Sequence, residues 1–456
     1  MRLMISILAV CLLAFSACRK SNEITTDKNA RLSFSRDTVL FDTVFTAVGS
    51  VNRRIKVFNE HSKAISISNI RLGGGTSSYF SLIINGVSAN EKSDVQIGGK
   101  DSISIYVKAT IDPTTFNQPF IVEDSILFQT NGNTQSIALI AYGQNAIFLN
   151  GETITTNTIW EAGLPHIINK SVTIAEGTTL NIAAGAKVFF HGSSVMNVKG
   201  SLRVNGSEYN PVMFSSDRLE NFYENEAGQW QGLRFTATSF NNKIQYATIK
   251  NAIVGITADS LTFDGSRKLT IANSTVKNMT VAGIVGYSTT VNGFNNLFYN
   301  SGQFLIYGIG GGSYNLKQNT FAGYNPEFSR RTPALYFSDL SNLAFSDLEV
   351  ELTNNIIWGT LTEELQIERK TTANITASVS YNIIKTALQT YNNLNFLSVD
   401  PKFVDPANGN FRLQMGSPAI NKGLNLSTDP FFGAFLKGDL TNAARTFPSE
   451  LGCYEQ

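Results

Sequence analysis

The stretch Val172-Thr-Ile-Ala-Glu-Gly177-Thr-Thr-Leu180-Asn-Ile182-Ala-Ala-Gly185 decides the fold of most of this chain. Short runs of alternating apolar and polar residues are each followed by a glycine, and the same pattern continues far along the sequence. An alternation with a period of two is typical of strands that bury one face. Glycine supplies the positive φ that tight turns need. The stretch therefore predicts many short strands joined by turns.

A longer unit recurs further along the chain, each time around a short apolar strand. A repeat of 22 to 36 residues with short strands predicts a solenoid whose rungs each carry three strands around a shared core. We expect roughly 12 rungs over residues 148–428, and a closing segment at 429–456. The central apolar residues of the repeats are Ile249, Val276, Phe298, Phe321, Ile357 and Ile384.

An asparagine ends several of these units, as at Asn251, Asn278 and Asn300. We expect each of them to lie in a turn, where its amide bonds the same amide one rung away. The alternative is a row of asparagines that binds a ligand.

Further segments give the solenoid a resemblance to a known family. They are Gly200-Ser-Leu-Arg-Val-Asn-Gly206, Pro211-Val-Met-Phe214, Gly228-Gln-Trp230-Gln-Gly232, Asp400-Pro-Lys-Phe-Val-Asp405-Pro406 and Leu451-Gly-Cys453. Together they resemble bacterial envelope lipoproteins with the right-handed parallel β-helix, or pectin-lyase-like, fold. The resemblance implies packing roles for Leu451 and Cys453. It implies no activity, because this fold hosts lyases, hydrolases, adhesins and inert spacers.

Residues 30–147 have the pattern of a different all-β domain. Apolar residues alternate, as at Ile55 and Val57, and the turn pairs Asn85-Gly86 and Asn131-Gly132 lie between such runs. Asparagine followed by glycine favours tight hairpins, and the number of short strands is typical of a β-sandwich.

This segment resembles the immunoglobulin-like domains of the abnormal-spindle/hydin group. The matching stretches are Phe41-Asp42-Thr43-Val44, Arg54–Asn59 and Ala138–Gly143. Such domains act as spacers or interaction modules, so the resemblance implies no catalytic residues here. Arg54-Ile55-Lys56 also matches a basic tripeptide of polygalacturonases, but its alternation favours an exposed strand face.

The N-terminus has the features of an export signal. Arg2 precedes the apolar run Leu3–Ala17, which is shorter than the roughly 20 residues needed to span a bilayer. Phe15-Ser-Ala-Cys18 resembles the lipobox of bacterial lipoproteins, and this implies lipid on Cys18. We therefore expect a signal peptide at 1–17, a tether at 18–29 and an outer-membrane lipoprotein of the cell envelope. An ordinary signal peptide cut after Ala17 is the alternative.

Charge and cysteine content exclude several classes of protein. Charged residues make up 16% of the chain and give a formal net charge of +1, which disfavours a nucleic-acid binder. The chain has 3 cysteines, and only Cys453 would remain as a thiol in a lipidated mature protein. No zinc spacing is present, and the glycine-rich run at 308–312 lacks the lysine of a phosphate loop.

One acidic stretch is the candidate ligand site. Carboxylates at this density could bind calcium or grip a sugar, and aromatic rings could stack on it. The alternative is a solvated loop with Trp230 buried against the rung below. The candidate residues are Asp217, Arg218, Glu220, Tyr223, Glu224, Glu226 and Trp230.

Catalytic motifs are scarce in the sequence. The histidines His61, His166 and His191 lie outside the Gly-His-Gly setting that polygalacturonase-like members use. We therefore expect an envelope protein whose β-helix binds a polysaccharide or an envelope protein without turnover and without a cofactor. The alternatives are a polysaccharide lyase or glycoside hydrolase acting near Asp217–Trp230, and a passive adhesin or spacer.

Overall fold

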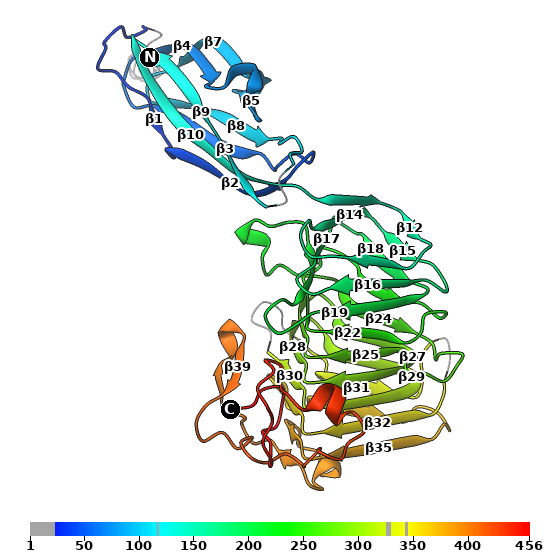
Figure 1. Cartoon of the computed structure of the whole chain (residues 1–456). Coiled ribbons are helices and arrows are strands. Elements are labelled where there is room, and N and C mark those ends of the chain that lie inside the picture. Colours follow the sequence, from blue (N-terminus) through cyan, green and yellow to red (C-terminus); the bar gives the residue numbers. More distant parts are fainter. Residues whose placement is uncertain (1–22, 116–117, 325–329, 343–344) are drawn as a thin grey trace, which may run out of the picture. The chain divides into compact units, whose positions relative to one another are not determined.

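The computed structural model describes residues 23–115, 118–324, 330–342 and 345–456. The chain divides into two compact units, Met1–Ala146 and Ile147–Gln456, and each is described by itself (Figure 1). The expected signal peptide and Cys18 lie outside the described residues. None of the helices in the described part of the chain is long and apolar enough to cross a membrane.

The first unit is a sandwich of two five-stranded sheets. Almost all of its strand pairs are antiparallel, but β2 and β10 pair in parallel. The first sheet has the order β1 (Ser33–Phe34), β3 (Arg53–Asn59), β8 (Asp101–Ala109), β5 (Phe80–Ile84) and β6 (Val87–Ser88). The second has the order β2 (Thr38–Phe45), β10 (Asn133–Gln144), β9 (Phe120–Thr130), β4 (Ile65–Leu72) and β7 (Glu91–Ile97).

Local sequence explains the strands and turns of this sandwich. In β3, Ile55 and Val57 are fully buried, whereas Arg54 and Lys56 are exposed, as the alternation predicts. At the tip of the hairpin between β5 and β6, Asn85 and Gly86 have φ values of 46° and 81°. Both residues tolerate this left-handed region, which matches the twist of the flanking strands. The immunoglobulin-like sandwich expected from the sequence is therefore confirmed.

The second unit is a parallel solenoid with three strands in most rungs (Figure 1). The first face contains β12 (Thr153–Ile154), β15 (Val172–Ile174), β18 (Val195–Val198), β21 (Gly232–Phe235), β24 (Val254–Asp259), β31 (Leu335–Ser338) and β34 (Leu365–Glu368). The second contains β13 (Thr158–Trp160), β16 (Thr179–Ala183), β19 (Ser201–Asn205), β22 (Asn242–Gln245), β25 (Leu269–Ala272), β32 (Leu348–Thr353) and β35 (Ile375–Ser380). The long strands β27 (Ala282–Phe294) and β29 (Phe304–Lys317) run through both faces.

The third face is an 11-stranded sheet, close to the roughly 12 rungs expected. Its strands are β11 (Ile147–Asn150), β14 (His166–Lys170), β17 (Lys187–Phe190), β20 (Val212–Ser216), β23 (Ala247–Lys250), β26 (Thr275–Met279), β28 (Leu297–Ser301), β30 (Thr320–Gly323), β33 (Ile356–Gly359), β36 (Ile383–Ile384) and β37 (Phe396–Leu397). The six repeated apolar residues pair in register from Ile249 to Ile384 and are buried in one core. The sequence repeat is therefore the rung of a parallel β-helix.

A buried row of asparagines runs beside this sheet, at a different position of the repeat from the row expected. Asn296 donates to Oδ1 of Asn319 at 3.0 Å, and Asn319 donates to Oδ1 of Asn355 at 2.9 Å. The row continues through Asn382 to Asn395. These asparagines open the repeated unit. The asparagines that end it form a second, shorter row, described below.

The chain after β37, residues 398–456, includes the closing segment expected at 429–456 and covers part of the outer side of the third sheet. It contains the hairpin of β38 (Phe403–Asp405) and β39 (Asn410–Leu413), whose Phe403 and Phe411 pack in one apolar cluster with Cys453. Leu451 and Cys453 are 1% and 0% exposed, as expected of packing positions. The short helical turns of the chain are η1 (Gly75–Ser77), η2 (Asn221–Tyr223), η3 (Gln389–Tyr391), η4 (Pro406–Asn408) and the π-helix η5 (Phe432–Leu436).

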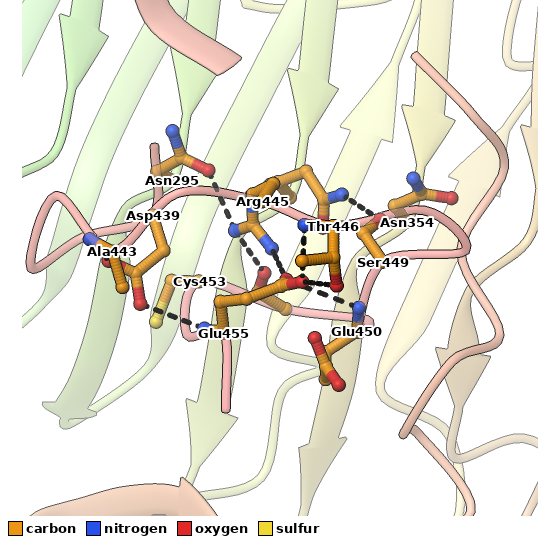
Figure 2. A network of polar contacts seen from close by, with 12 residues as sticks. Asn295, Asn354, Asp439, Ala443, Arg445, Thr446, Ser449, Glu450, Cys453 and Glu455 are labelled. Carbon is orange, nitrogen blue, oxygen red and sulfur yellow. Dashed lines mark hydrogen bonds and ion pairs between the residues drawn. The ribbon is translucent and has the colours of Figure 1, made fainter. Parts of the chain in front are cut away.

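A buried ion pair attaches the end of the chain to the solenoid (Figure 2). The Arg445 guanidinium donates to Oε2 of Glu455 at 3.0 Å and to Oδ1 of Asn295 at 2.9 Å. Asn295 belongs to a turn of the solenoid and has a φ of 53°. Glu455 also accepts hydrogen bonds from the backbone and hydroxyl of Thr446. Each buried charge thus has an opposite charge and further hydrogen bonds beside it, which offsets part of the cost of burial, although Nε of Arg445 has no hydrogen-bond partner among the described residues.

Candidate functional site

The predicted site residues lie on the loop that leaves β20, but they do not converge. Asp217 accepts a hydrogen bond from Nδ1 of His191, one rung below, at 2.7 Å. Burial raises the pKa of Asp217, although the bond to His191 opposes that shift. The second carboxylate oxygen of Asp217 is buried and has no partner among the described residues.

Arg218 links two more of the predicted residues. Its guanidinium pairs with Glu220 at 3.1 Å and lies 3.7 Å from the ring centroid of Tyr223. One face of the Tyr223 ring is therefore covered by a cation of the same loop. Glu224 and Glu226 are exposed, and Glu226 contributes its backbone carbonyl to Nε2 of Gln229.

Trp230 requires a correction. The sequence includes it among residues that could stack on a ligand, but Trp230 is fully buried. Its ring stacks on Phe190 with centroids 3.9 Å apart, and its Nε1 donates to the carbonyl of Lys250 at 2.8 Å. A ring enclosed in this way offers no face to a sugar, so Trp230 is a core residue, as the alternative reading had it.

The acidic side chains also have separate partners. Asp217 bonds His191, and Glu220 bonds Arg218. Across the described ranges, no three His, Cys, Asp or Glu residues lie close enough to hold a metal ion. Calcium binding by this loop stays a prediction.

A groove lies next to this loop on the outer side of the third sheet. Its volume is about 340 Å³, and the exposed Glu224 is the one predicted site residue that lines it. Lys277 of β26 and Tyr299 of β28 occupy outward positions that pair between neighbouring strands. The other lining residues are Asn225, Asn278, Asn300, Tyr324, Pro406, Ala407, Asn408, Gly409 and Phe411.

Aromatic rings and the closing hairpin shape the groove. The ring centroids of Tyr299 and Phe411 are 5.1 Å apart, and those of Tyr324 and Phe411 are 6.1 Å apart. Gly409, in the hairpin turn, has a φ of 75°, and a Cβ there would lie 3.1 Å from the hydroxyl of Tyr299. The turn can therefore approach Tyr299 closely because this position is glycine. Burial raises the pKa of Tyr324, so its hydroxyl stays protonated.

The asparagines that end the repeats form a short ladder into this groove. Asn278 donates to Oδ1 of Asn251 at 3.1 Å, and Asn300 donates to Oδ1 of Asn278 at 2.8 Å. Asn278 also bonds Oδ1 of Asn225 in the neighbouring loop. Asn300 is 8% exposed, and its own Oδ1 has no hydrogen-bond partner within the described ranges. The ladder thus ends in a buried acceptor without a partner, on a residue that lines the groove.

The ladder stops because the next two rungs have glycine at this position. A Cβ on Gly323 would lie 2.3 Å from a nitrogen of Arg330, and one on Gly359 would lie 2.2 Å from an oxygen of Glu364. Arg330 and Glu364 form a buried ion pair at 2.6 Å in that space. The repeat therefore changes from amide ladder to ion pair one rung beyond Asn300.

The sequence does not predict most of the residues that line the groove. The asparagine repeat was noted, and a ligand-binding row was the alternative interpretation of it. Lys277 and Tyr299 gave no signal beyond their outward positions in the repeat. Asn408 and Phe411 lie between the last strand of the solenoid and the closing segment expected at 429–456, and no pattern in that stretch predicts a groove.

Comparisons with known proteins do not identify a family for this chain. No family model and no curated protein matches the chain. Among solved structures, the ASH/PapD-like domain 7 of human CEP192 has 6% identity and a TM-score of 0.19, over 26% of this chain and 87% of that domain. A family 123 glycoside hydrolase from Clostridium perfringens has 13% identity and a TM-score of 0.19, over 27% of this chain and 26% of that enzyme. Likeness at this level supports no inference about function.

Proposed function

We propose that this chain is a cell-envelope protein whose β-helix captures a glycan in the groove between the Glu224 loop and the 406–409 turn. The observation that carries the proposal is the free Oδ1 of Asn300, buried at the end of an amide ladder in a groove lined by aromatic rings.

The lining matches the chemistry of a sugar. A buried acceptor without a partner costs roughly 1–3 kcal/mol, and a sugar hydroxyl that donates to Asn300 would recover part of this. Tyr299 and Tyr324 offer apolar ring surface for the C–H face of a sugar, while Asn225 and Asn408 offer further amide groups. The groove therefore combines polar groups that can fix the orientation of a ligand with aromatic surface that can cover its apolar face.

The groove favours binding over hydrolysis. Most glycosidases place two carboxyl groups on either side of the scissile bond, about 5 to 9.5 Å apart. Glu224 is the one carboxylate among the described residues that line this groove. Asp217 bonds His191 instead and is not among the lining residues. A glycoside hydrolase acting in this groove would need a second carboxyl group opposite Glu224.

The envelope location rests on the sequence of the N-terminus. The apolar run Leu3–Ala17 followed by Cys18 supports export and lipid attachment. Lipid on Cys18 would hold the protein at a membrane surface while the β-helix presents its groove to glycans of the envelope or its surroundings.

A polysaccharide panel tests the proposal. The soluble form Arg19–Gln456 is incubated with plant, animal and microbial polysaccharides, with and without calcium, and both the bound fraction and the released chain ends are measured. Binding without release supports capture. Release of a defined product would favour the enzyme reading, and the absence of both would leave a passive adhesin or spacer. A calcium requirement would support the acidic-loop hypothesis.

A further inference from the structure

The two sheets of the N-terminal sandwich carry opposite charge. The strands of the first sheet contain the cations Arg53, Arg54, Lys56 and Lys108 and the single acid Asp101. The strands of the second sheet contain the cations Arg71 and Lys92 and the acids Asp42, Glu91, Asp94, Glu123 and Asp124. The charge of this unit is thus separated between its faces although the whole chain is nearly neutral.

The cations of the first sheet gather around shallow concavities. One, of about 380 Å³, is lined by Ser35, Arg36, Asn52, Arg53, Arg54 and Lys56. A second, of about 530 Å³, contains Lys108, Val51 and the intervening outward residues of β5 and β8. Arg53 pairs with Asp42 at 3.1 Å. Within the described ranges, Arg36, Arg54 and Lys56 are exposed and form no ion pair. We call Arg36, Arg53, Arg54, Lys56 and Lys108 the basic face.

Exposed apolar side chains border the basic face. Val48 and Val51, in the loop between β2 and β3, are 37% and 41% exposed. The Lys108 side chain packs against Gly49 in this loop, where an added Cβ would lie 2.2 Å from Cε. Cations beside exposed apolar side chains are typical of surfaces that lie in the interface of a membrane, where phosphates meet acyl chains.

Few residues separate the folded sandwich from Cys18, the expected lipidation site. Ile24 forms a parallel bridge with Ala64, so the described fold begins there. Only Arg19–Glu23 separate Ile24 from Cys18, and a fully extended segment of this length spans about 20 Å. A lipid on Cys18 would therefore hold the sandwich within about one strand length of the bilayer.

We propose that the basic face docks on the anionic phospholipid surface of the membrane that holds the lipid. This inference rests on the envelope location proposed above, but it is independent of the glycan groove. Each lysine or arginine near an anionic bilayer contributes about 1 kcal/mol. The exposed valines favour a bilayer over a purely polyanionic partner, because a soluble polyanion offers no apolar phase for them.

Vesicle sedimentation tests the docking without the lipid anchor. Unlipidated Arg19–Gln456 is mixed with phosphatidylglycerol/phosphatidylethanolamine vesicles and with neutral phosphatidylcholine vesicles. We expect binding to the anionic vesicles alone, weakened by added salt because surface charges are screened. Arg54→Glu/Lys56→Glu is expected to weaken binding by more than about tenfold. Lys28→Glu/Lys92→Glu makes the same charge change away from the basic face and is expected to have a much smaller effect.

Several results would overturn the docking proposal. They are equal binding to neutral vesicles, equal loss in both double variants, and binding to heparin or polyphosphate without binding to vesicles. If the reversed variant does not fold, as judged by its thermal unfolding, Arg36→Ser/Lys108→Ser serves in its place with the same expectation. Glycan binding by the groove should be unchanged in these variants, so failure of one proposal is distinguishable from failure of the other.

Discussion

Nδ2 of Asn300 donates to Oδ1 of Asn278 at 2.8 Å, and the Oδ1 of Asn300 is left without a partner in the described part of the chain. Asn278 likewise directs its Nδ2 toward the preceding rung, where it donates to Oδ1 of Asn251. The amides of the ladder therefore all point the same way. The next rung has Gly323 at this position of the repeat, so no further asparagine follows Asn300 in the ladder. The structural ladder thereby leaves a buried acceptor without a partner on a residue that lines the groove.

Replacement of Trp230 should test its assignment to the core. Trp230→Ala is expected to lower the free energy of unfolding by about 3–5 kcal/mol, because the variant loses the stack on Phe190 and leaves a cavity. Phe222→Ala is the matched control, since Phe222 is 76% exposed, and should change stability by less than about 0.5 kcal/mol. Urea unfolding measures both values. Equal, small effects would show that Trp230 is not a core residue.

The thiol of Cys453 should be inert in the folded protein. Burial raises its pKa to about 12, and the side chain is 0% exposed. In Arg19–Gln456 it is the sole cysteine. A thiol reagent at pH 8 should therefore label the protein only after guanidinium unfolds it. Rapid labelling of the native protein would show that the closing segment opens readily.

The closing segment should lose stability as the pH rises toward neutrality. Burial and the neighbouring Glu455 raise the pKa of Glu450 to about 7. The folded protein therefore holds a proton that the unfolded chain releases near the ordinary pKa of glutamate. This contribution to stability is full below that ordinary value and is lost as the pH rises through about 7.

Glu450→Gln tests this pH dependence, because glutamine resembles the protonated acid. We expect the variant to gain stability over the wild type at pH 8 and to gain little at pH 4. Thermal unfolding at several pH values measures the difference. Glu176→Gln, at an exposed position, is the control and should show the same small change at every pH. A parallel pH profile for both variants would contradict the assignment to Glu450.

Much of the fold could be predicted because its rules are local and repeated. The period-two alternation around Ile55 and Val57 and the Asn85-Gly86 turn follow directly from residue preferences. The spacing from Ile249 to Ile384 revealed the rungs because the same position is buried in each one. The row of asparagines that end the units was also predictable, whereas the longer row of asparagines that open them was not.

The candidate groove could not be predicted in the same way. Glu224, Lys277 and Asn408 are far apart in the sequence and meet only because the closing hairpin folds back over the third sheet. Nothing in the local sequence sets that packing. Trp230 could not be placed from the sequence either. The residues around it are the same whether its ring is exposed or packed on Phe190, and only the structure shows the packing.

The central claim is that the groove beside Asn300 binds a glycan. The most direct test is calorimetric titration, with the best ligand from the polysaccharide panel, of the wild type, Asn300→Ala and Asn169→Ala. Asn169 also bonds an asparagine one rung away, Asn150, at 3.1 Å, but it does not line the groove. We predict that Asn300→Ala, still folded at the titration temperature although it loses the bond to Asn278, weakens binding by about tenfold or more, and that Asn169→Ala binds like the wild type. Equal affinity in all three proteins would contradict the claim.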